Sequence, residues 1–131
     1  MVKFGYTIIY VLNVDKSLSF FESAFGMKRR FISEEKDYGE LDTGETVLAF
    51  ASHELGKTNF SGGYISASDS EEPLGVEIAL VAEDVPSVHA SALAHGAIEL
   101  RSPDLKPWGQ LVSYIRCPSG ILIELCTPIA S

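Results

Sequence analysis

The chain has 131 residues, of which 46% are hydrophobic and 21% charged, and this balance predicts one compact domain and excludes a disordered chain. Its formal net charge of −8 repels nucleic-acid phosphates and anionic lipid, so we expect no nucleic acid and no membrane among its partners. Chains of this length bury roughly two-thirds of their unfolded surface, so the core needs no structural metal.

The sequence also indicates where in the cell the protein is located. Residues 1–10 lack the charged segment and apolar stretch of an export signal, and no apolar run reaches the ~20 residues of a membrane span. Cys117 and Cys126 are not spaced like metal ligands, and a chain of this size does not need their disulfide. We therefore expect reduced thiols and a cytoplasmic protein.

The first half is predicted to form a βαβββ unit. Residues 4–11 are rich in β-branched and aromatic side chains, which predicts a strand. A helix follows, capped by Asn13 or Asp15 and ended by Gly26. The apolar stripe of this helix consists of Leu18, Phe21 and Phe25. Three short antiparallel strands are then expected at residues 29–33, 37–42 and 46–52, with a tight turn at Thr43-Gly44.

The second half repeats this order after a polar connection. Residues 53–73 are rich in Gly, Ser and acidic side chains, which predicts a linker or mobile loop. A strand is expected at residues 75–82, followed by a helix that Asp84 caps and Gly96 ends. That helix has Pro86 in its first turn and Val85, Val88 and Ala92 on its apolar side. The last strands are predicted at residues 98–101, 110–116 and 121–127.

An internal repeat supports this division. A shift of 70 residues aligns six pairs: Gly5 with Gly75, Val11 with Val81, Ser17 with Ser87, Leu18 with Val88, Ala24 with Ala94, and Gly26 with Gly96. The expected architecture is an α+β domain of tandem βαβββ units, with halves at 1–55 and 74–131 and a loop at 56–73. Two four-stranded sheets would each carry a helix outside and share a concave inner face, where the functional site is expected.

Two stretches carry a family resemblance that covers almost the whole chain. One runs from Tyr6 through Val11 and residues 15–21 to Phe25-Gly26. The other runs from Pro107-Trp108-Gly109-Gln110 through Pro118-Ser119-Gly120 to Ile123-Glu124-Leu125. On these residues the chain resembles the vicinal oxygen chelate superfamily of glyoxalases, bleomycin-resistance proteins and extradiol dioxygenases. The resemblance implies the fold, but its members range from metalloenzymes to plain binding proteins.

The resemblance also implies four metal-ligand positions. They lie at the start of the first strand, on the fourth, at the start of the fifth and on the eighth, and relatives place His or Glu there. The residues at these positions are Tyr6, Ala49, Glu77 and Glu124. Two carboxylates and a phenol do not supply the three or four ligands that a divalent transition metal prefers. We therefore expect no metal and no other cofactor.

The three histidines lie elsewhere. His53 follows the fourth strand, His89 lies on the second helix, and His95 lies in that helix's last turn. We interpret them as exposed or capping residues, with His95 interacting with the helix dipole, rather than as metal ligands. His53 remains the histidine to examine for a metal role.

Glu77 and Glu124 have two interpretations. If both face inward, they would act as general acid and base on a carbonyl substrate, as the resemblance to glyoxalases implies. A buried pair of like charges would also raise the pKa of one carboxyl group, which would then stay protonated and donate a hydrogen bond. The alternative is that each is an ion or hydrogen-bond partner of Arg116 or Tyr6.

Aromatic and small residues suggest a pocket on the inner face. Tyr6, Ile8 and Tyr10 share one face of the first strand, and the fourth strand carries small residues at Ala49 and Ala51. Together with Tyr38, Trp108 and Tyr114, they are expected to line an apolar pocket for a flat ligand, with Glu77 and Glu124 as its polar anchors. Alternatively, Trp108 plugs the end of the sheet or is buried at a dimer contact.

Two functions are compatible with this pattern. The first is a metal-free binding protein that sequesters an aromatic or cationic small molecule, as bleomycin-resistance proteins do. The second is a glyoxalase-like lyase or isomerase that acts on a small carbonyl or glutathione-type substrate through Glu124, with or without Glu77. The number of metal ligands favours the first. The resemblance and the open strand edges predict a homodimer.

Overall fold

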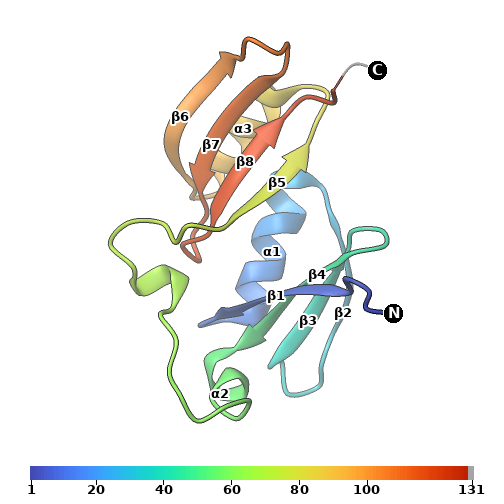
Figure 1. Cartoon of the computed structure of the whole chain (residues 1–131), viewed down its shortest axis with the longest axis vertical. Coiled ribbons are helices and arrows are strands. Elements are labelled where there is room, and N and C mark those ends of the chain that lie inside the picture. The colour runs from blue at the N-terminus through green and yellow to red at the C-terminus, as the bar shows by residue number, and fades with distance from the viewer. Residues whose placement is uncertain (130–131) are drawn as a thin grey trace. The chain divides into compact units, whose positions relative to one another are not determined.

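The computed structural model describes residues 1–129, which divide into two compact units (Figure 1). The first unit comprises residues 1–66 and the second begins at Ala67. Each unit contains its own four-stranded mixed sheet and its own helix, which confirms the α+β prediction of tandem βαβββ units. The boundary between the units falls inside the predicted 56–73 loop.

The first unit has the strand order β1-β4-β3-β2. Its elements are β1 (Tyr6–Val11), α1 (Val14–Phe25), β2 (Lys28–Ile32), β3 (Tyr38–Asp42), β4 (Val47–Ser52) and α2 (His53–Gly56). Strand β1 runs parallel to β4, while β2, β3 and β4 pair antiparallel as predicted. The predicted first strand begins two residues earlier than β1 does, at Phe4.

Helix α1 packs on one face of this sheet through the predicted stripe. Asn13, rather than Asp15, is the N-cap: its side chain accepts a hydrogen bond from the Lys16 backbone N–H at 2.9 Å. Gly26 ends the helix in the left-handed conformation at φ 69°. Leu18 and Phe21 are fully buried, and the Phe21 ring lies 5.3 Å from that of Phe50 on β4. The helix therefore covers the face of the sheet that carries Phe50.

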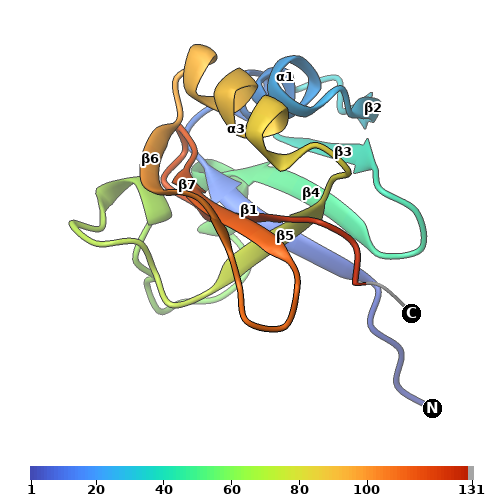
Figure 2. The same cartoon turned by 90° about the horizontal axis from the view of Figure 1, so that it is seen from above.

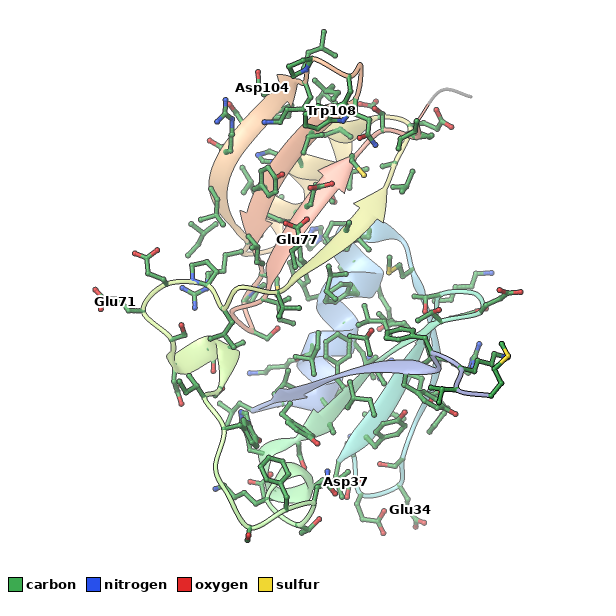
Figure 3. All side chains as sticks on the ribbon, viewed as in Figure 1. Glu34, Asp37, Glu71, Glu77, Asp104 and Trp108 are labelled. Atoms are coloured by element: carbon green, nitrogen blue, oxygen red, sulfur yellow. The ribbon has the colours of Figure 1, made fainter. Side chains whose placement is uncertain are left out.

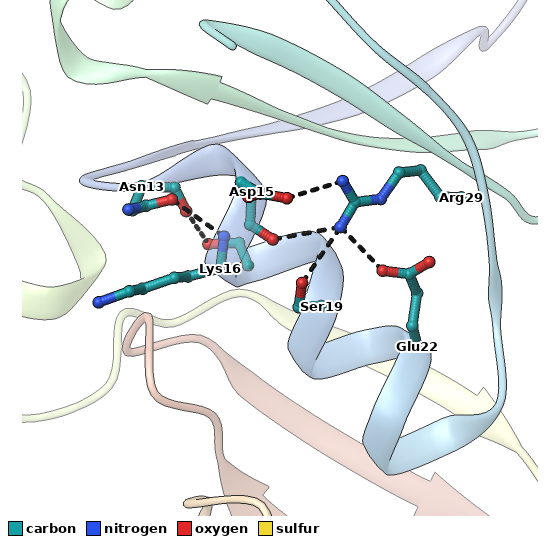
Figure 4. A network of polar contacts seen from close by, with 7 residues as sticks. Asn13, Asp15, Lys16, Ser19, Glu22 and Arg29 are labelled. Atoms are coloured by element: carbon teal, nitrogen blue, oxygen red, sulfur yellow. Dashed lines mark hydrogen bonds and ion pairs between the residues drawn. The ribbon is translucent and has the colours of Figure 1, made fainter.

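Arg29 ties strand β2 to helix α1 (Figure 4). Its guanidinium donates to the Asp15 carboxylate at 2.7 Å and to the Glu22 carboxylate at 2.8 Å, and it also donates to the Ser19 hydroxyl at 3.2 Å. The hydrogen bond from Arg29 lowers the pKa of Asp15 below its ordinary value. Asp15 thus acts as an anchor for β2 instead of as the helix cap.

The second unit has the equivalent strand order β5-β8-β7-β6 (Figure 1), and its helix lies on one face of the sheet (Figure 2). Its elements are the short 3-10 helix η1 (Ala67–Asp69), β5 (Glu77–Val81), α3 (Val85–Ala94), β6 (Ile98–Leu105), β7 (Leu111–Arg116) and β8 (Leu122–Cys126). The predicted cap of α3 is confirmed, because the Asp84 side chain accepts from the Ser87 backbone N–H. Strand β6 is longer than predicted and includes Pro103, which an edge strand tolerates. No helix within residues 1–129 is long and apolar enough to cross a membrane.

The repeat is real, but the 70-residue frame is wrong for the strands and for the starts of the helices. The N-caps Asn13 and Asp84, and the first strand residues Tyr6 and Glu77, are separated by 71 residues. Helix α1 has 12 residues and α3 has 10, so the spacing between equivalent positions changes along the helices. The glycines that follow them, Gly26 and Gly96, are 70 residues apart. Val11 is consequently buried at 2% exposure, whereas Val81 is 66% exposed.

The 53–73 segment, predicted to be a linker or mobile loop, is held by specific contacts. It contains α2 and η1. In the first unit, the Tyr64 ring packs 4.8 Å from the Tyr10 ring. In the second unit, Arg116 donates to the carbonyl oxygens of Ala67 at 2.9 Å and Ser70 at 2.8 Å. Sequence composition alone does not show these long-range contacts.

Candidate ligand-binding site

Each sheet has one face covered by its helix and one opposite face, which we call the helix-free face. In the second unit, α3 packs on the face that carries Ile115, Ile123 and Leu125, all fully buried. Because side chains alternate along a strand, Glu77, Tyr114 and Glu124 lie on the helix-free face. The structure therefore brings these three candidate residues onto one face.

Glu77 and Glu124 form a hydrogen-bonded pair, which we call the carboxyl pair. Glu77 as a whole residue is exposed, yet partial burial of its carboxyl group, its hydrogen bond to Glu124 and the Glu124 charge raise its pKa above the ordinary value. The Tyr114 hydroxyl donates to Glu124 Oε1 at 2.9 Å, and this hydrogen bond raises the pKa of Tyr114. Glu77 therefore keeps its proton to a higher pH than an isolated glutamate does.

The expected partner Arg116 does not contact the carboxyl pair. Besides Ala67 and Ser70, its guanidinium donates to the Gly120 carbonyl at 3.0 Å. Arg101, on neighbouring β6, pairs with Asp104 at 2.8 Å. The interpretation of Glu124 as an ion-pair partner of Arg116 is therefore wrong. Glu124 instead accepts a hydrogen bond from the Tyr114 hydroxyl.

Trp108 lies at the opposite end of the second sheet from Glu77 (Figure 3). It is in the turn between β6 and β7, is 67% exposed, and donates from its indole N–H to Gln110 Oε1 at 2.7 Å. The structure does not bring Trp108 together with the carboxyl pair in this unit. Its exposure also shows that Trp108 does not plug the sheet end.

The helix-free face of the first sheet carries the other predicted ligand-binding residues. Tyr6 and Ile8 are 59% and 45% exposed, whereas Ala49 is fully buried. Tyr38 is half-buried, and its hydroxyl donates to Glu40 Oε2 at 2.7 Å. Burial, followed by this hydrogen bond, raises the pKa of Tyr38 well above its ordinary range. Sequence reasoning missed Glu40, although alternation from Tyr38 places it on the same face.

The strand register confirms that the four implied ligand positions are equivalent between the units. Tyr6 pairs with Val47, two residues before Ala49, and Glu77 pairs with Leu122, two residues before Glu124. Alanine has no ligand atom, and the carboxyl pair is hydrogen-bonded to itself. Within residues 1–129, no group of three His, Cys, Asp or Glu side chains gathers as metal ligands would. This donor set does not fit a divalent transition metal.

The prediction that the histidines are exposed or capping is wrong for His89. His89 is 4% exposed, with Nδ1 2.9 Å from the Ser113 hydroxyl and Nε2 2.7 Å from the Glu99 carboxylate. This Ser-His-Glu series is not a nucleophilic site, because Ser113 is fully buried and no substrate reaches it. The series instead joins α3 to strands β6 and β7.

The other two histidines also have local partners. His95 is the C-cap of α3 and donates from Nδ1 to the Ser91 carbonyl at 2.8 Å, as its predicted capping role requires. His53 Nδ1 lies 2.7 Å from the Tyr64 hydroxyl, and Nε2 lies 3.3 Å from the Ser66 hydroxyl. Both ring nitrogens of His53 are therefore engaged in holding the 57–66 segment.

A pocket of about 480 Å³ lies in the first unit, where the parallel strands β1 and β4 end. Its lining includes Asp15, Glu35, Asp37 and Glu54, together with Lys36. Sequence reasoning missed this pocket, because the turn between β2 and β3 and the start of α1 supply its walls from distant parts of the sequence.

Comparison with known proteins agrees with this geometry. Residues 3–125 match the model of the Glyoxalase/Bleomycin resistance protein/Dioxygenase superfamily. The chain belongs to this superfamily. The match covers both βαβββ units, so the resemblance expected from the strand and turn motifs is confirmed. No curated protein matches this sequence.

Solved structures of the superfamily share the fold at low sequence identity. A glyoxalase-related enzyme from Fulvimarina pelagi aligns with TM-score 0.80 and 20% identity, over 98% of this chain and 89% of its own. A superfamily enzyme from Burkholderia phytofirmans PsJN aligns with TM-score 0.74 and 17% identity, over 98% and 100%. TioX from Micromonospora sp. ML1 aligns with TM-score 0.70 and 16% identity, over 96% and 98%. These similarities establish the fold and leave function to the site residues.

Proposed function

We propose that this protein binds an aromatic or cationic small molecule without a metal, in the manner of bleomycin-resistance proteins. The observation that supports the proposal is the carboxyl pair of Glu77 and Glu124 on the helix-free face of the second sheet. The neighbouring Arg101 and Arg116 pair with other groups, so among the described residues no cationic side chain forms an ion pair with the carboxyl pair. A ligand ammonium or guanidinium group would gain two carboxylate partners.

Tyr114 orients one carboxylate of the carboxyl pair for such a ligand. Its hydroxyl donates to Glu124 Oε1, which holds the orientation of this carboxylate. The charged hydrogen bonds that a cation would form here are each worth about 1.5–3 kcal/mol. Aromatic ligands would gain further contact with the Tyr114 ring.

A second candidate function is that of a glyoxalase-like lyase or isomerase acting on a small carbonyl or glutathione-type substrate. The feature that favours it is the closeness of two carboxyl groups with a raised pKa at Glu77, because one group would act as acid while the other acts as base. Without a metal, this chemistry would lack several kcal/mol of carbonyl polarisation. We therefore place binding ahead of catalysis.

Ligand screening by thermal shift, followed by titration with each hit, tests the binding proposal. Glu124→Gln should weaken binding by ~1–3 kcal/mol and flatten its dependence on salt. Glu83→Gln is the matched control, since Glu83 is exposed and outside the strands. Equal affinity of the Glu124→Gln variant and the parent for every hit would refute the proposal. Trp108→Ala tests separately whether a ligand reaches the β6–β7 turn.

The catalytic alternative has its own assay. The protein is incubated with methylglyoxal and glutathione, and thioester formation is followed by absorbance. Turnover lost in the Glu124→Gln variant would favour the enzyme. Absence of turnover in a parent protein that binds hits from the screen would favour the binding protein.

The proposal of metal-free function has a direct measurement. Ala49 and Tyr6 occupy two of the implied ligand positions, so we expect no stoichiometric Zn, Ni, Fe or Mn in the purified protein. Elemental analysis that finds about one metal per chain, lost in the Glu124→Gln variant, would contradict this expectation.

We further propose that the protein is a cytoplasmic homodimer. Cys117 and Cys126 are both free and buried, which suits a reducing compartment. The assembly is supported by the bare edges of β1 and β5, which are discussed below.

A further inference from the structure

Glu40 is a charged side chain in an unusual position on the first sheet. It lies on β3, and its side chain is only 10% exposed. The Tyr38 hydroxyl donates to Oε2 at 2.7 Å. The nearest cation, the Arg30 guanidinium, lies 3.6 Å from Oε1 and also 3.6 Å from the Asp42 carboxylate. One oxygen of Glu40 is therefore well hydrogen-bonded and the other is held by a long ion pair.

The long ion pair is the weak part of this arrangement. A buried carboxylate is costly unless both of its oxygens are paired at hydrogen-bond distance. A separation of 3.6 Å exceeds that distance. Arg30 is itself 43% exposed at the edge strand β2 and is shared between two carboxylates. Its guanidinium is consequently a cation that another cation can replace.

The residues around Glu40 suit an organic cation. In the register of the sheet, Glu40 lies beside Ala49, and Tyr38 lies beside Ala51. On the far side of β4, Ile8 and Tyr10 are the partners of the same two alanines. Tyr6 lies on the same face, beside Val47 of β4. Alkylammonium and guanidinium ions bind where tyrosine rings surround a carboxylate.

We propose that Glu40 is an anchor for an organic cation on the helix-free face of the first sheet, and that Arg30 occupies its place in the absence of ligand. The Tyr38 hydroxyl holds Oε2, so Oε1 receives the cation. The incoming guanidinium or alkylammonium group displaces Arg30 toward Asp42. This anchor lies in a different unit from the carboxyl pair, so the proposal does not depend on the function proposed above.

Titration with methylguanidinium chloride tests the proposal, followed by two-dimensional NMR of the backbone amides of β3 and β4. Saturable shifts at Gly39, Glu40 and Ala49 are expected in the parent and should be absent in a titration with sodium chloride. Glu40→Gln should abolish them. Arg30→Gln should bind several-fold more tightly, because the competing cation is removed.

Two matched variants separate a specific site from general charge effects. Asp42→Asn removes the other carboxylate partner of Arg30 but keeps Glu40, so the saturable shifts should persist in this variant, whereas they should be absent in Glu40→Gln. Glu83→Gln, which removes an exposed carboxylate outside the strands, should leave the titration unchanged. Weaker or unaltered binding in Arg30→Gln would overturn the proposal, as would shifts that persist in Glu40→Gln. Arg30 is on an exposed edge, so its variant stays informative even where Glu40→Gln unfolds.

Discussion

Partial burial of the Glu77 carboxyl group, together with its hydrogen bond to Glu124 on the adjacent strand and the charge of that residue, raises the pKa of Glu77. The folded protein therefore holds a proton on Glu77 at a pH where the unfolded chain has released it. A raised carboxyl pKa means that stability falls as pH rises from the ordinary value of 4.5 through the raised value. This is opposite in sign to Asp15, whose lowered pKa makes the folded state lose stability as pH falls.

Glu77→Gln should therefore stabilise the protein at neutral and alkaline pH. Glutamine resembles the protonated carboxyl group and removes the repulsion from Glu124. Urea unfolding of the parent and the variant, compared at about pH 4 and about pH 8, measures the effect. The gain should appear at the higher pH and fade at the lower one, while Glu83→Gln shows no such trend. A stability gain of equal size at both pH values would contradict the raised pKa of Glu77.

His89→Leu should destabilise the second unit by about 1–3 kcal/mol, because it leaves the fully buried Ser113 hydroxyl without this partner. The double variant His89→Leu/Ser113→Ala removes both buried groups and should recover part of the loss. Chemical denaturation of the three proteins measures the coupling. Strictly additive losses would show that the hydrogen bond contributes nothing to stability.

The connection between the units depends on element packing rather than on turn composition. Arg116 on β7 holds the carbonyl groups of η1 and of the residues after it. Gly120, in the turn before β8, lies directly against the backbone of Ala67 and Ser68. A β carbon at this position would overlap that backbone. The β7–β8 turn and η1 therefore pack as one piece.

Gly120→Ala and Gly109→Ala form a matched test of this packing. Both glycines have positive φ, 90° and 101°, so both substitutions strain the backbone. An added β carbon meets nothing within 4 Å at Gly109 but overlaps Ala67 at Gly120. Gly120→Ala should therefore cost a further ~1–3 kcal/mol in urea unfolding. It should also make the 67–72 segment more sensitive to proteolysis. Equal losses in the two variants would exclude the close approach.

At the scale of the whole molecule, the four edge strands of the two sheets differ in how well their side chains prevent pairing with another chain. Strand β2 carries Lys28, Arg29 and Arg30, and β6 carries Pro103 with several charged residues. Strand β1 has no charged residue, and β5 has Glu77 alone. Charges and proline keep an edge from pairing with another chain, so β1 and β5 are the edges that would be covered in an assembly.

The predicted homodimer should therefore depend on β1. Ile8→Lys places a charge beside this bare edge and should shift equilibrium sedimentation toward monomer. Phe31→Lys is the control, since Phe31 is similarly exposed, at 44% against 45%, but lies on the already basic β2. Monomeric parent protein at micromolar concentration would contradict the dimer, and equal behaviour of the two variants would contradict the role of β1.

Features that depend only on neighbouring residues, such as helix caps and the faces of strands, could be predicted from the amino-acid sequence alone. Asp84 and Gly26 mark helix ends because cap hydrogen bonds and positive φ involve neighbouring residues. Alternation along the first strand placed Tyr6, Ile8 and Tyr10 on one face for the same reason, since the period of a strand is a local property. The family and the α+β fold followed from these motifs and their repetition.

Long-range pairing was decided only by the tertiary structure. Arg116 had an expected carboxylate partner, but the fold places it against backbone carbonyls from a distant segment. His89 is buried because α3 packs on β7, and Glu40 has Arg30 as its cation because β2 bulges against β3. Hydrogen-bond partners and burial depend on which elements meet in space. Sequence periodicity specifies the face of each element, and packing specifies what that face contacts.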